Sequence, residues 1–510
     1  MEKYILAHDL GTSGNKATLY TTYGKLIKSS VSGYTTKYYN QNWAEQDPND
    51  WWKAVCLSTR EIIVGIEKEK IGAICFSGQM MGCLCVDKKG NPLNNHLLYC
   101  DQRATKEETE ILNKIDLNEF YKITGHRASA SYSVAKLMWI KNNLPEIYKN
   151  TYKMLHAKDF INYKMTGKMF TEYSDASGTN LLDLNTYTWS DQLIDVTGIE
   201  GDKLPKLCNS TDCIDVLTKQ AAEEMNLRHG IPVIAGGGDG VCAGVGAGSV
   251  APGKTYNYLG SSSWIATTTK EPLYDENMRT FVWAHAIPGY FHPCGTVQTA
   301  GSSYSWMKDE LALLEKKEAE NKKISPYEIL ENIIKSAPPG SNGLIFLPYL
   351  LGERTPRWNP NAKGSLIGLT LSHKRSEIFR SVLEGVTYNL SLIVDIFRNY
   401  MSIDEITLIG GGAISEEWRQ MISDIYEAEI LKPKYLEEAT SMGAAVIGGV
   451  GSGLVKDFTV VDDFIEVEER RKPNIKNQSI YRESKKIFDN AYYSLEKIFD
   501  QLSRIKKVEE

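Results

Sequence analysis

The sequence has 510 residues, of which 42% are hydrophobic and 24% are charged, and its formal net charge is −6 at pH 7. This length exceeds the roughly 100–200 residues of a typical domain and predicts two large domains. The mildly acidic balance argues against nucleic acid as a partner, and the lack of an apolar run of roughly 18 residues argues against a membrane span.

The nine cysteines are odd in number, are scattered from Cys56 to Cys294 and form no CxxC pair. This pattern does not support a zinc site and is typical of a reducing compartment. The first residues, 1–7, lack the apolar core and the cleavage site of a signal peptide. We therefore expect a cytoplasmic protein.

The first part of the chain predicts a β-hairpin. Extended runs at 4–8 and 16–20 flank a turn at 9–14, and a third run at 27–34 extends the meander. A helix is predicted over 50–68, and a buried strand follows at 71–76. From about 106 to 166 the pattern is mostly helical.

The turn at 9–14 has the composition of a phosphate-binding loop. Gly11 and Gly14 allow backbone N–H groups to approach an anion closely, and Thr12 and Ser13 add hydroxyl donors. Asp9, at the end of the strand, could hold a magnesium-bound water, because Mg²⁺ prefers oxygen ligands and keeps much of its hydration. An ordinary hairpin turn is the alternative.

A second glycine-rich segment carries a carboxylate. A strand at 231–235 runs into Gly-Gly-Gly-Asp at 236–239, and a helix of small residues is predicted over 241–248. Glycines leave room for a ligand beside Asp239, and a low-dielectric setting could tune its pKa for a general base that acts on a sugar hydroxyl. A helix N-cap is the alternative, and the local sequence leaves both open.

A second hairpin is predicted at 254–268, with Gly-Ser-Ser-Ser at 260–263 as its turn. Two such turns, one in each half, could grip a polyphosphate from both sides. The repeated hairpin indicates two related domains with a boundary near 249–252, so we expect an N-terminal domain over 1–249 and a C-terminal domain over 250–510.

The stretch at 248–255 matches the P-loop pattern G-x-x-x-x-G-K-[ST], with Lys254 as its lysine. A working P-loop follows a strand and opens a helix, so that the helix N-terminus meets the phosphate. Here the predicted order is reversed, with a helix before the loop and a strand after it. We therefore do not expect this stretch to bind phosphate.

Near the end of the chain, a strand predicted at 405–409 ends in Gly-Gly-Gly-Ala at 410–413. Helices are predicted over 416–426 and 477–507. The triple glycine would let a flat ring such as adenine pass close to the backbone, although a plain strand-to-helix turn is its commoner meaning.

Taken in this order, the segments resemble the FGGY carbohydrate kinase family over nearly the whole chain. Residues 131–140 (SYSVAKLMWI) fit the N-terminal signature of the family, and 364–369, followed by Glu377 and 380–384, fit the C-terminal one. The resemblance implies an α/β fold of two actin-like (ribonuclease H-like) ATPase domains with a central interdomain cleft. It also implies ATP-dependent phosphorylation of a sugar hydroxyl with Mg²⁺.

The resemblance implies roles for individual residues. Asp239 would accept the proton of the sugar hydroxyl, and Asp9 would hold Mg²⁺ indirectly, through water. The residues expected to bind the phosphates from the two turns and beside them are Gly11, Thr12, Ser13, Lys16, Gly260, Ser261 and Ser262. Those expected on the adenosine side are Gly301, Ser305, Gly411, Gly412 and Glu416. Those expected at the sugar are Gln79, Met80, Met81, Asp101, Asp239 and Gly240.

Within the family, the stretches 43–48, 77–80, 236–239 and 347–356 most resemble xylulokinases, which favours D-xylulose as the substrate and the 5-phosphate as the product. Two positions depart from that pattern: Met81 stands where xylulokinases usually carry His, and Gly240 where they usually carry Asn. Both lost side chains would hydrogen-bond a polyol, and such partners strongly affect preference.

Other readings therefore stay open. The pair Asp239–Gly240 and the pair Arg357–Trp358 resemble gluconate kinases of the same family, so another ketose, a polyol or an aldonate is the alternative substrate. A non-catalytic actin-like nucleotide-binding protein is the alternative from another class. The expected partners are a small sugar and ATP, with neither nucleic acid nor a membrane, and a homodimer is left open.

Overall fold

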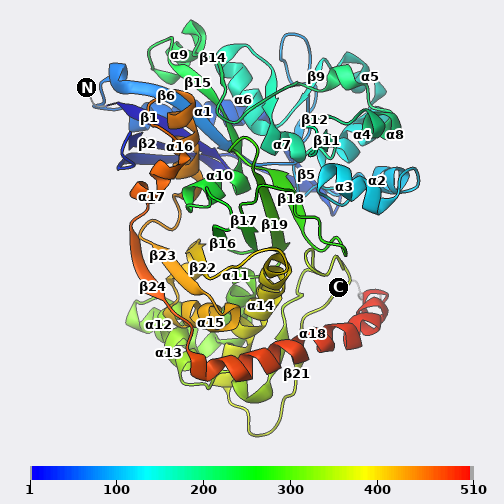
Figure 1. The fold of residues 1–510 in the computed structure, drawn as a ribbon, viewed down its shortest axis with the longest axis vertical. Coiled ribbons are helices and arrows are strands. Elements are labelled where there is room, and N and C mark those ends of the chain that lie inside the picture. The colour runs from blue at the N-terminus through cyan, green and yellow to red at the C-terminus, as the bar shows by residue number, and fades with distance from the viewer. Residues whose placement is uncertain (1–2, 506–510) are drawn as a thin grey trace.

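The computed structural model describes residues 3–505 and contains two mixed β-sheets, one in each half of the molecule (Figure 1). The first sheet has the order β14-β15-β6-β1-β2-β3. Its strands are β1 (Tyr4–Leu10), β2 (Gly14–Thr21), β3 (Leu26–Gly33), β6 (Ile71–Gly78), β14 (Cys213–Val216) and β15 (Pro232–Gly238). β1 and β2 form the expected hairpin, and β1, β6 and β15 run parallel.

Helix α1 (Pro48–Ile62) packs its apolar side, including Trp51 and Val55, into the core of this half. Proline at the first helical position and the Asp47 cap fix its start. The helix predicted over 50–68 is wrong at its C-terminal end, because the chain turns at Gly65, where φ is 77°.

The chain between β6 and β15 builds a layer of helices and short strands on the first half. The helices are α2 (Thr105–Leu112), α3 (Leu117–Thr124), α4 (Ser133–Asn143), α5 (Pro145–Asn150), α6 (Ala157–Thr166), α7 (Tyr173–Ser177), α8 (Asp191–Thr197) and α9 (Lys219–Met225). The short strands, with two that precede α1, are β4 (Lys37–Tyr39), β5 (Trp43–Gln46), β7 (Leu84–Val86), β8 (His96–Leu97), β9 (Lys153–Leu155), β10 (Phe170–Glu172), β11 (Leu182–Asp183), β12 (Thr188–Trp189) and β13 (Lys206–Cys208).

The second sheet has the order β18-β19-β17-β16-β22-β23-β24. Its strands are β16 (Thr255–Leu259), β17 (Ser263–Thr267), β18 (Phe281–Ala284), β19 (Phe291–Val297), β22 (Glu405–Ile409), β23 (Glu429–Pro433) and β24 (Val467–Arg471). A separate pair is formed by β20 (Ile345–Leu347) and β21 (Ser365–Ile367). The expected second hairpin is β16–β17.

Helices cover the second sheet, and the long α18 lies along its outer side (Figure 1). These helices are α11 (Gly301–Trp306), α12 (Leu313–Lys322), α13 (Pro326–Lys335), α14 (Arg375–Arg398), α15 (Glu416–Tyr426) and α18 (Ile475–Ser503). The short α17 (Val461–Phe464) lies instead near α16, with Phe464 against Gly24 of the first half. α15 has the predicted bounds. The last helix was predicted over 477–507, and α18 ends at Ser503; residues 506 and 507 of that prediction lie outside the described part. Within 3–505, none of the helices combines the length and apolarity needed to cross a bilayer.

Two helices cross at the joint between the sheets: α10 (Asp239–Gly246) and α16 (Ala439–Gly451). A Cβ at Gly246 would lie 1.8 Å from the carbonyl oxygen of Ala439, so only glycine permits this approach. Although α16 follows the expected boundary near 249–252, it packs against β1 and β6 of the first sheet. Each sheet is therefore tied to the other half through a central helix.

Candidate active site

The carboxyl ends of three parallel strands place the two predicted acidic residues near one another. Asp9 on β1 is level with Ser77 on β6, and Ser77 is level with Gly237 on β15. Because adjacent strands lie about 4.8 Å apart, the backbones of Asp9 and Gly237 are about 10 Å apart. Asp239 follows as the first residue of α10. This edge is where open α/β sheets bind their ligands.

The two carboxyl groups influence each other. Burial and, second, the charge of Asp9 raise the pKa of Asp239 to about 7, against the opposing hydrogen bond from the Gly240 N–H at 2.8 Å. Burial also raises the pKa of Asp9, although Lys16 and the Ser77 hydroxyl lower it. A carboxylate with a pKa near neutrality can accept a proton under physiological conditions.

The first turn of α10 is held from the second sheet. The Tyr256 hydroxyl donates to the carbonyl oxygen of Gly240 at 2.6 Å and accepts from the Trp264 indole N–H at 2.8 Å. Trp264 stacks on Tyr258 with 4.0 Å between ring centroids. The hairpin β16–β17 thus contacts the segment that carries Asp239.

A cavity of about 240 Å³ lies between Asp9 and the second half. It is lined by Asp9, Tyr258, Ile409, Gly410, Gly411, Leu436, Glu437, Ala439 and Thr440. A larger cavity of about 730 Å³ shares Tyr258 and Gly411 with it. The larger cavity contains the five residues predicted on the adenosine side: Gly301, Ser305, Gly411, Gly412 and Glu416. Gly260 and Ser261 also line it, whereas Ser262 lies in the same turn outside the lining.

The turn of the first hairpin is fixed through its carbonyl groups. Gln46 donates to the Thr12 carbonyl at 2.6 Å, the Gly11 N–H donates to Gly14 at 3.0 Å, and the backbone N–H of Tyr34 donates to the Ser13 carbonyl at 3.2 Å. The Lys16 ammonium reaches across to the second half, 3.2 Å from the Glu437 carbonyl and 3.6 Å from the Glu438 carboxylate.

The residues predicted at the sugar divide into two groups. Gln79 and Met80 lie just after the end of β6: Gln79 donates to Gln46 at 2.8 Å, and the Met80 sulfur would lie 2.4 Å from a Cβ at Gly238. The Gln79 Oε1 has no hydrogen-bond partner within residues 3–505. A Cβ at Gly240 would meet nothing within 4 Å, so open space adjoins it.

Asp101 differs, because its buried carboxylate is already engaged. It accepts from the Arg103 guanidinium and from the Ala44 N–H, each at 2.7 Å.

Sequence reasoning missed Lys136, which lies inside the N-terminal signature. Its buried ammonium donates to the carbonyl of Met81 at 2.8 Å and to the carbonyl of Ser131. Burial lowers the pKa of Lys136 to about 7, although Asp101 opposes the shift. Met81 has a φ of 61°, which is rare for a side-chain-bearing residue, and Lys136 braces that conformation. A lysine in an apolar segment was the available signal.

Three other sequence features have structural roles. The Lys254 ammonium lies 3.4 Å from Glu405 at the surface, and α10 before and β16 after it confirm the reversed order that rules against a P-loop. Arg357 bonds Asp489 of α18 at 2.8 Å, whereas Trp358 packs against the cluster that contains Met80 and Met81. In the C-terminal signature, Glu384 accepts from the Gly340 N–H at 2.9 Å in a buried network.

Comparisons with known proteins agree with this geometry. Residues 4–246 match the FGGY family of carbohydrate kinases, N-terminal domain, and 255–452 match its C-terminal domain. The chain is 32% identical to a gluconokinase of Bacillus subtilis (99% of this chain, 98% of the relative) and 32% identical to a xylulose kinase of the same organism (96% and 97%). It resembles the crystal structure of a ligand-bound xylulose kinase from Lactobacillus acidophilus with a TM-score of 0.91 and 27% identity, over 98% of this chain and 100% of that one.

Proposed function

The chain belongs to the FGGY family of carbohydrate kinases, and from this premise we propose that it transfers the γ-phosphoryl group of ATP to D-xylulose, giving the 5-phosphate, with Asp239 as the general base. One observation carries the proposal. Asp239 stands at the edge of the first sheet, in a turn held by Tyr256 of the second sheet. A base at that joint can meet a sugar bound to one half and a nucleotide bound to the other.

In this proposal the chain mainly positions the reactants, as phosphoryl transfer requires. The large cavity holds the adenosine, while Thr12, Ser13, Ser261 and Lys16 hold the phosphates. Asp239 takes the proton from the attacking hydroxyl.

The oxygen-rich lining of the small cavity, with Asp9, Glu437 and Thr440, fits a hydrated magnesium ion. Mg²⁺, when bound, supplies charge neutralisation at the transferring group, and Asp9 would hold it through water.

D-Xylulose is favoured by the stretches that resemble xylulokinases and by the relatives that carry that name. Gluconate is the second candidate, because a gluconokinase is equally similar and because the open space beside Gly240 could admit a different acceptor. The position of Arg357 at α18 does not add to that case.

We also propose that residues 1–249 form the sugar-binding domain with the catalytic base, that 250–510 form the nucleotide-binding domain, and that the enzyme works in the cytoplasm. The nine free thiols are compatible with that compartment. A homodimer is the assembly to test by light scattering.

The test is ADP release from ATP with D-xylulose, other ketoses, polyols and gluconate, each with the wild type and Asp239→Asn. We expect D-xylulose to be the best acceptor and Asp239→Asn to lower kcat at least about 10²-fold. Faster turnover with gluconate would replace the proposed substrate. A lack of stimulation by every sugar would favour the non-catalytic nucleotide-binding protein.

A further inference from the structure

A buried hydrogen-bond chain holds the peptide group between Gly237 and Gly238, one peptide group before Asp239. The Gly238 N–H donates to the Ser174 hydroxyl at 2.9 Å, and that hydroxyl donates to Oε1 of Glu172 at 2.7 Å. Glu172 and Ser174 are both fully buried. Their positions in the sequence, 64 residues or more before Gly238, make this a tertiary link rather than a local turn.

Glu172 is fixed on all sides. Its carboxylate also accepts from the backbone N–H groups of Ser174 at 2.8 Å and Asp175 at 2.9 Å, and from the Ser210 hydroxyl at 2.8 Å. Four donors around one carboxylate leave Ser174 only one favourable orientation, in which its lone pair faces Gly238.

A buried ammonium balances this charge. The Lys158 Nζ lies 3.7 Å from Glu172 and 3.1 Å from both Asp159 and Asp175. The group His156, Asp159 and Asp175 has the spacing of a metal site, but the Lys158 ammonium already supplies the cation there. Lys158 also packs directly under Gly78, which pairs with Gly238 in the sheet.

Gly238 is the N-cap of α10, and Asp239 is the first residue of the helix. The direction of the Asp239 side chain therefore depends on the backbone of Gly238, which starts from the plane of the Gly237–Gly238 peptide group. We propose that Ser174 and Glu172 are positioning residues that fix this plane and so aim the Asp239 carboxylate at the acceptor hydroxyl. This inference rests on the proposed role of Asp239 as the base.

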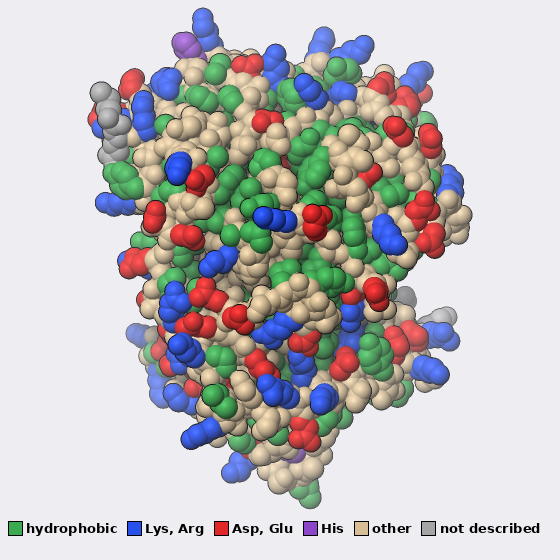
Figure 2. Space-filling model, viewed as in Figure 1, with side chains coloured by type: hydrophobic (Ala, Val, Ile, Leu, Met, Phe, Trp, Pro, Cys, Tyr) green, Lys and Arg blue, Asp and Glu red, His purple; other side chains and the backbone are tan. Residues whose placement is uncertain are grey.

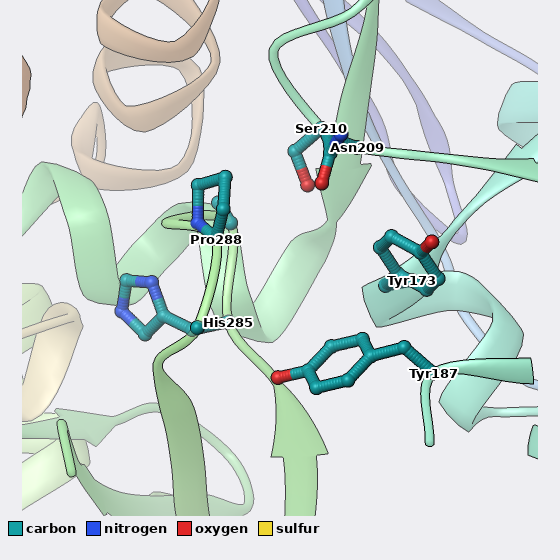
Figure 3. A pocket seen from close by; sticks show the side chains of 8 residues that line it. Tyr173, Tyr187, Asn209, Ser210, His285 and Pro288 are labelled. Carbon is teal, nitrogen blue, oxygen red and sulfur yellow. The ribbon is translucent and has the colours of Figure 1, made fainter. Parts of the chain in front are cut away.

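The hydrogen-bond chain ends at Ser210, away from the two cavities of the candidate site. Ser210 lines a separate cavity of about 240 Å³ between the first half and the β18–β19 turn, where Figure 3 shows Tyr173, Tyr187, His285 and Pro288 around the space. Neither Ser174 nor Glu172 lines the small or the large cavity of the candidate site, so they act on the sugar only through Asp239.

The same helix provides a matched control. Ser177 is also buried on α7, where it donates to the Tyr173 carbonyl at 2.8 Å and accepts from the Ala284 N–H at 3.1 Å, but it has no bond to Gly238. Ser174→Ala and Ser177→Ala thus remove equivalent hydroxyls, of which only one is linked to Asp239.

The experiment compares kcat, both KM values and thermal stability for the full chain carrying Ser174→Ala, Ser174→Cys or Ser177→Ala. Ser174→Cys keeps the side-chain size and guards against a folding defect. We expect both Ser174 variants to lose about 10- to 100-fold in kcat with KM values unchanged, because a small misplacement of a reacting group has this effect. The pH at half-maximal kcat should also shift, because a displaced Asp239 carboxylate would change its distance from Asp9 and its hydrogen bond from the Gly240 N–H.

Near-normal kcat in the Ser174 variants, with Asp239→Asn still inactive, would overturn the positioning role and leave the proposed base intact. Equal losses of kcat in the Ser174 and Ser177 variants would also overturn it, since that outcome is expected of a purely structural helix. Near-normal turnover by Asp239→Asn would instead contradict the proposed role of Asp239 as the general base.

Discussion

The hydroxyl of Tyr256 donates a 2.6 Å hydrogen bond to the carbonyl oxygen of Gly240, the residue after Asp239. Tyr256 belongs to β16 of the second sheet, whereas Gly240 belongs to α10, which directly follows β15 of the first sheet. The position of Asp239 is thereby linked to the hairpin whose turn contributes Gly260 and Ser261 to the large cavity.

Tyr256→Phe should separate this link from general packing. The substitution removes the hydroxyl and leaves the Gly240 carbonyl and the Trp264 N–H without their partner, so we expect kcat to fall about 3- to 10-fold and stability to fall by about 1–3 kcal/mol. Steady-state kinetics and thermal unfolding would measure both. The control is Tyr426→Phe. It removes a buried hydroxyl that donates to the Asn257 side chain at 3.1 Å and has no bond to the segment that carries Asp239. It should lose stability and retain kcat; an equal loss of kcat there would contradict the link.

Activity should depend on pH through Asp239. Burial and the negative charges of Asp9 and Asp175 raise the pKa of Asp239 to about 7. A general base acts when deprotonated, so kcat should fall about tenfold per pH unit below 7 and reach a plateau above it. Saturating Mg²⁺ keeps the ionisation of the nucleotide constant during the measurement.

Asp175→Asn provides the check on that assignment. It removes a like charge, so the midpoint of the profile should move to lower pH, whereas ionisation of the nucleotide would be unaffected. An unchanged midpoint would assign the titration to another group.

The buried negative charge of Asp239 should also lower the stability of the folded protein above about pH 7. Its folded pKa of about 7 lies above the value of about 3.9 in the unfolded chain, so its favourable contribution is complete below about pH 4 and is lost as pH rises through 7. Asp239→Asn should therefore raise Tm by about 2–4 °C at pH 8, after allowance for the partial exposure of this side chain, and leave it unchanged near pH 4. Scanning fluorimetry without ligands would measure this, and a lower Tm at pH 8 would contradict the burial of an uncompensated charge.

The two hairpins could be predicted because they depend on residues close in sequence: alternating strands and a glycine turn at 9–14 and again at 260–263. The family signatures likewise identified the fold. Helix α16 packing back on β1 could not be predicted, since nothing local tells a small-residue helix which sheet it will contact.

The same limit applies within the site. The proximity of Asp9 to Asp239 depends on the register of β1, β6 and β15, and the Ser174–Gly238 bond joins residues 64 apart. The resemblance to the family placed Asp101 at the sugar, and the bond that this carboxylate accepts from Arg103 could not be predicted from it. Side-chain partners of this kind arise from tertiary packing, which a pattern of residue types does not specify. On the face seen in Figure 2, basic and acidic side chains are interspersed, so surface charge does not mark the site there.

Substitutions at two adjacent glycines, Gly411 and Gly412, should separate an effect on nucleotide binding from an effect on stability. A Cβ at Gly411 would meet no atom within 4 Å, and Gly411 lines both cavities of the candidate site. Gly411→Leu should therefore fold normally while its side chain occupies space proposed for ATP, so we expect KM for ATP to rise at least about 10-fold with KM for the sugar unchanged. Isothermal titration with ADP would confirm that binding, rather than chemistry, is affected.

Gly412→Ala should behave differently although it is the smaller change. A Cβ there would lie 2.4 Å from Cγ of Leu259, a fully buried residue of β16, so the strand or the loop must shift. We expect overpacking to lower the free energy of unfolding by about 1–3 kcal/mol, which a fall in Tm would report. If Gly411→Leu instead bound ADP as well as the wild type does, the nucleotide would have to lie elsewhere than between Gly411 and Tyr258, and the assignment of the large cavity to adenosine would be wrong.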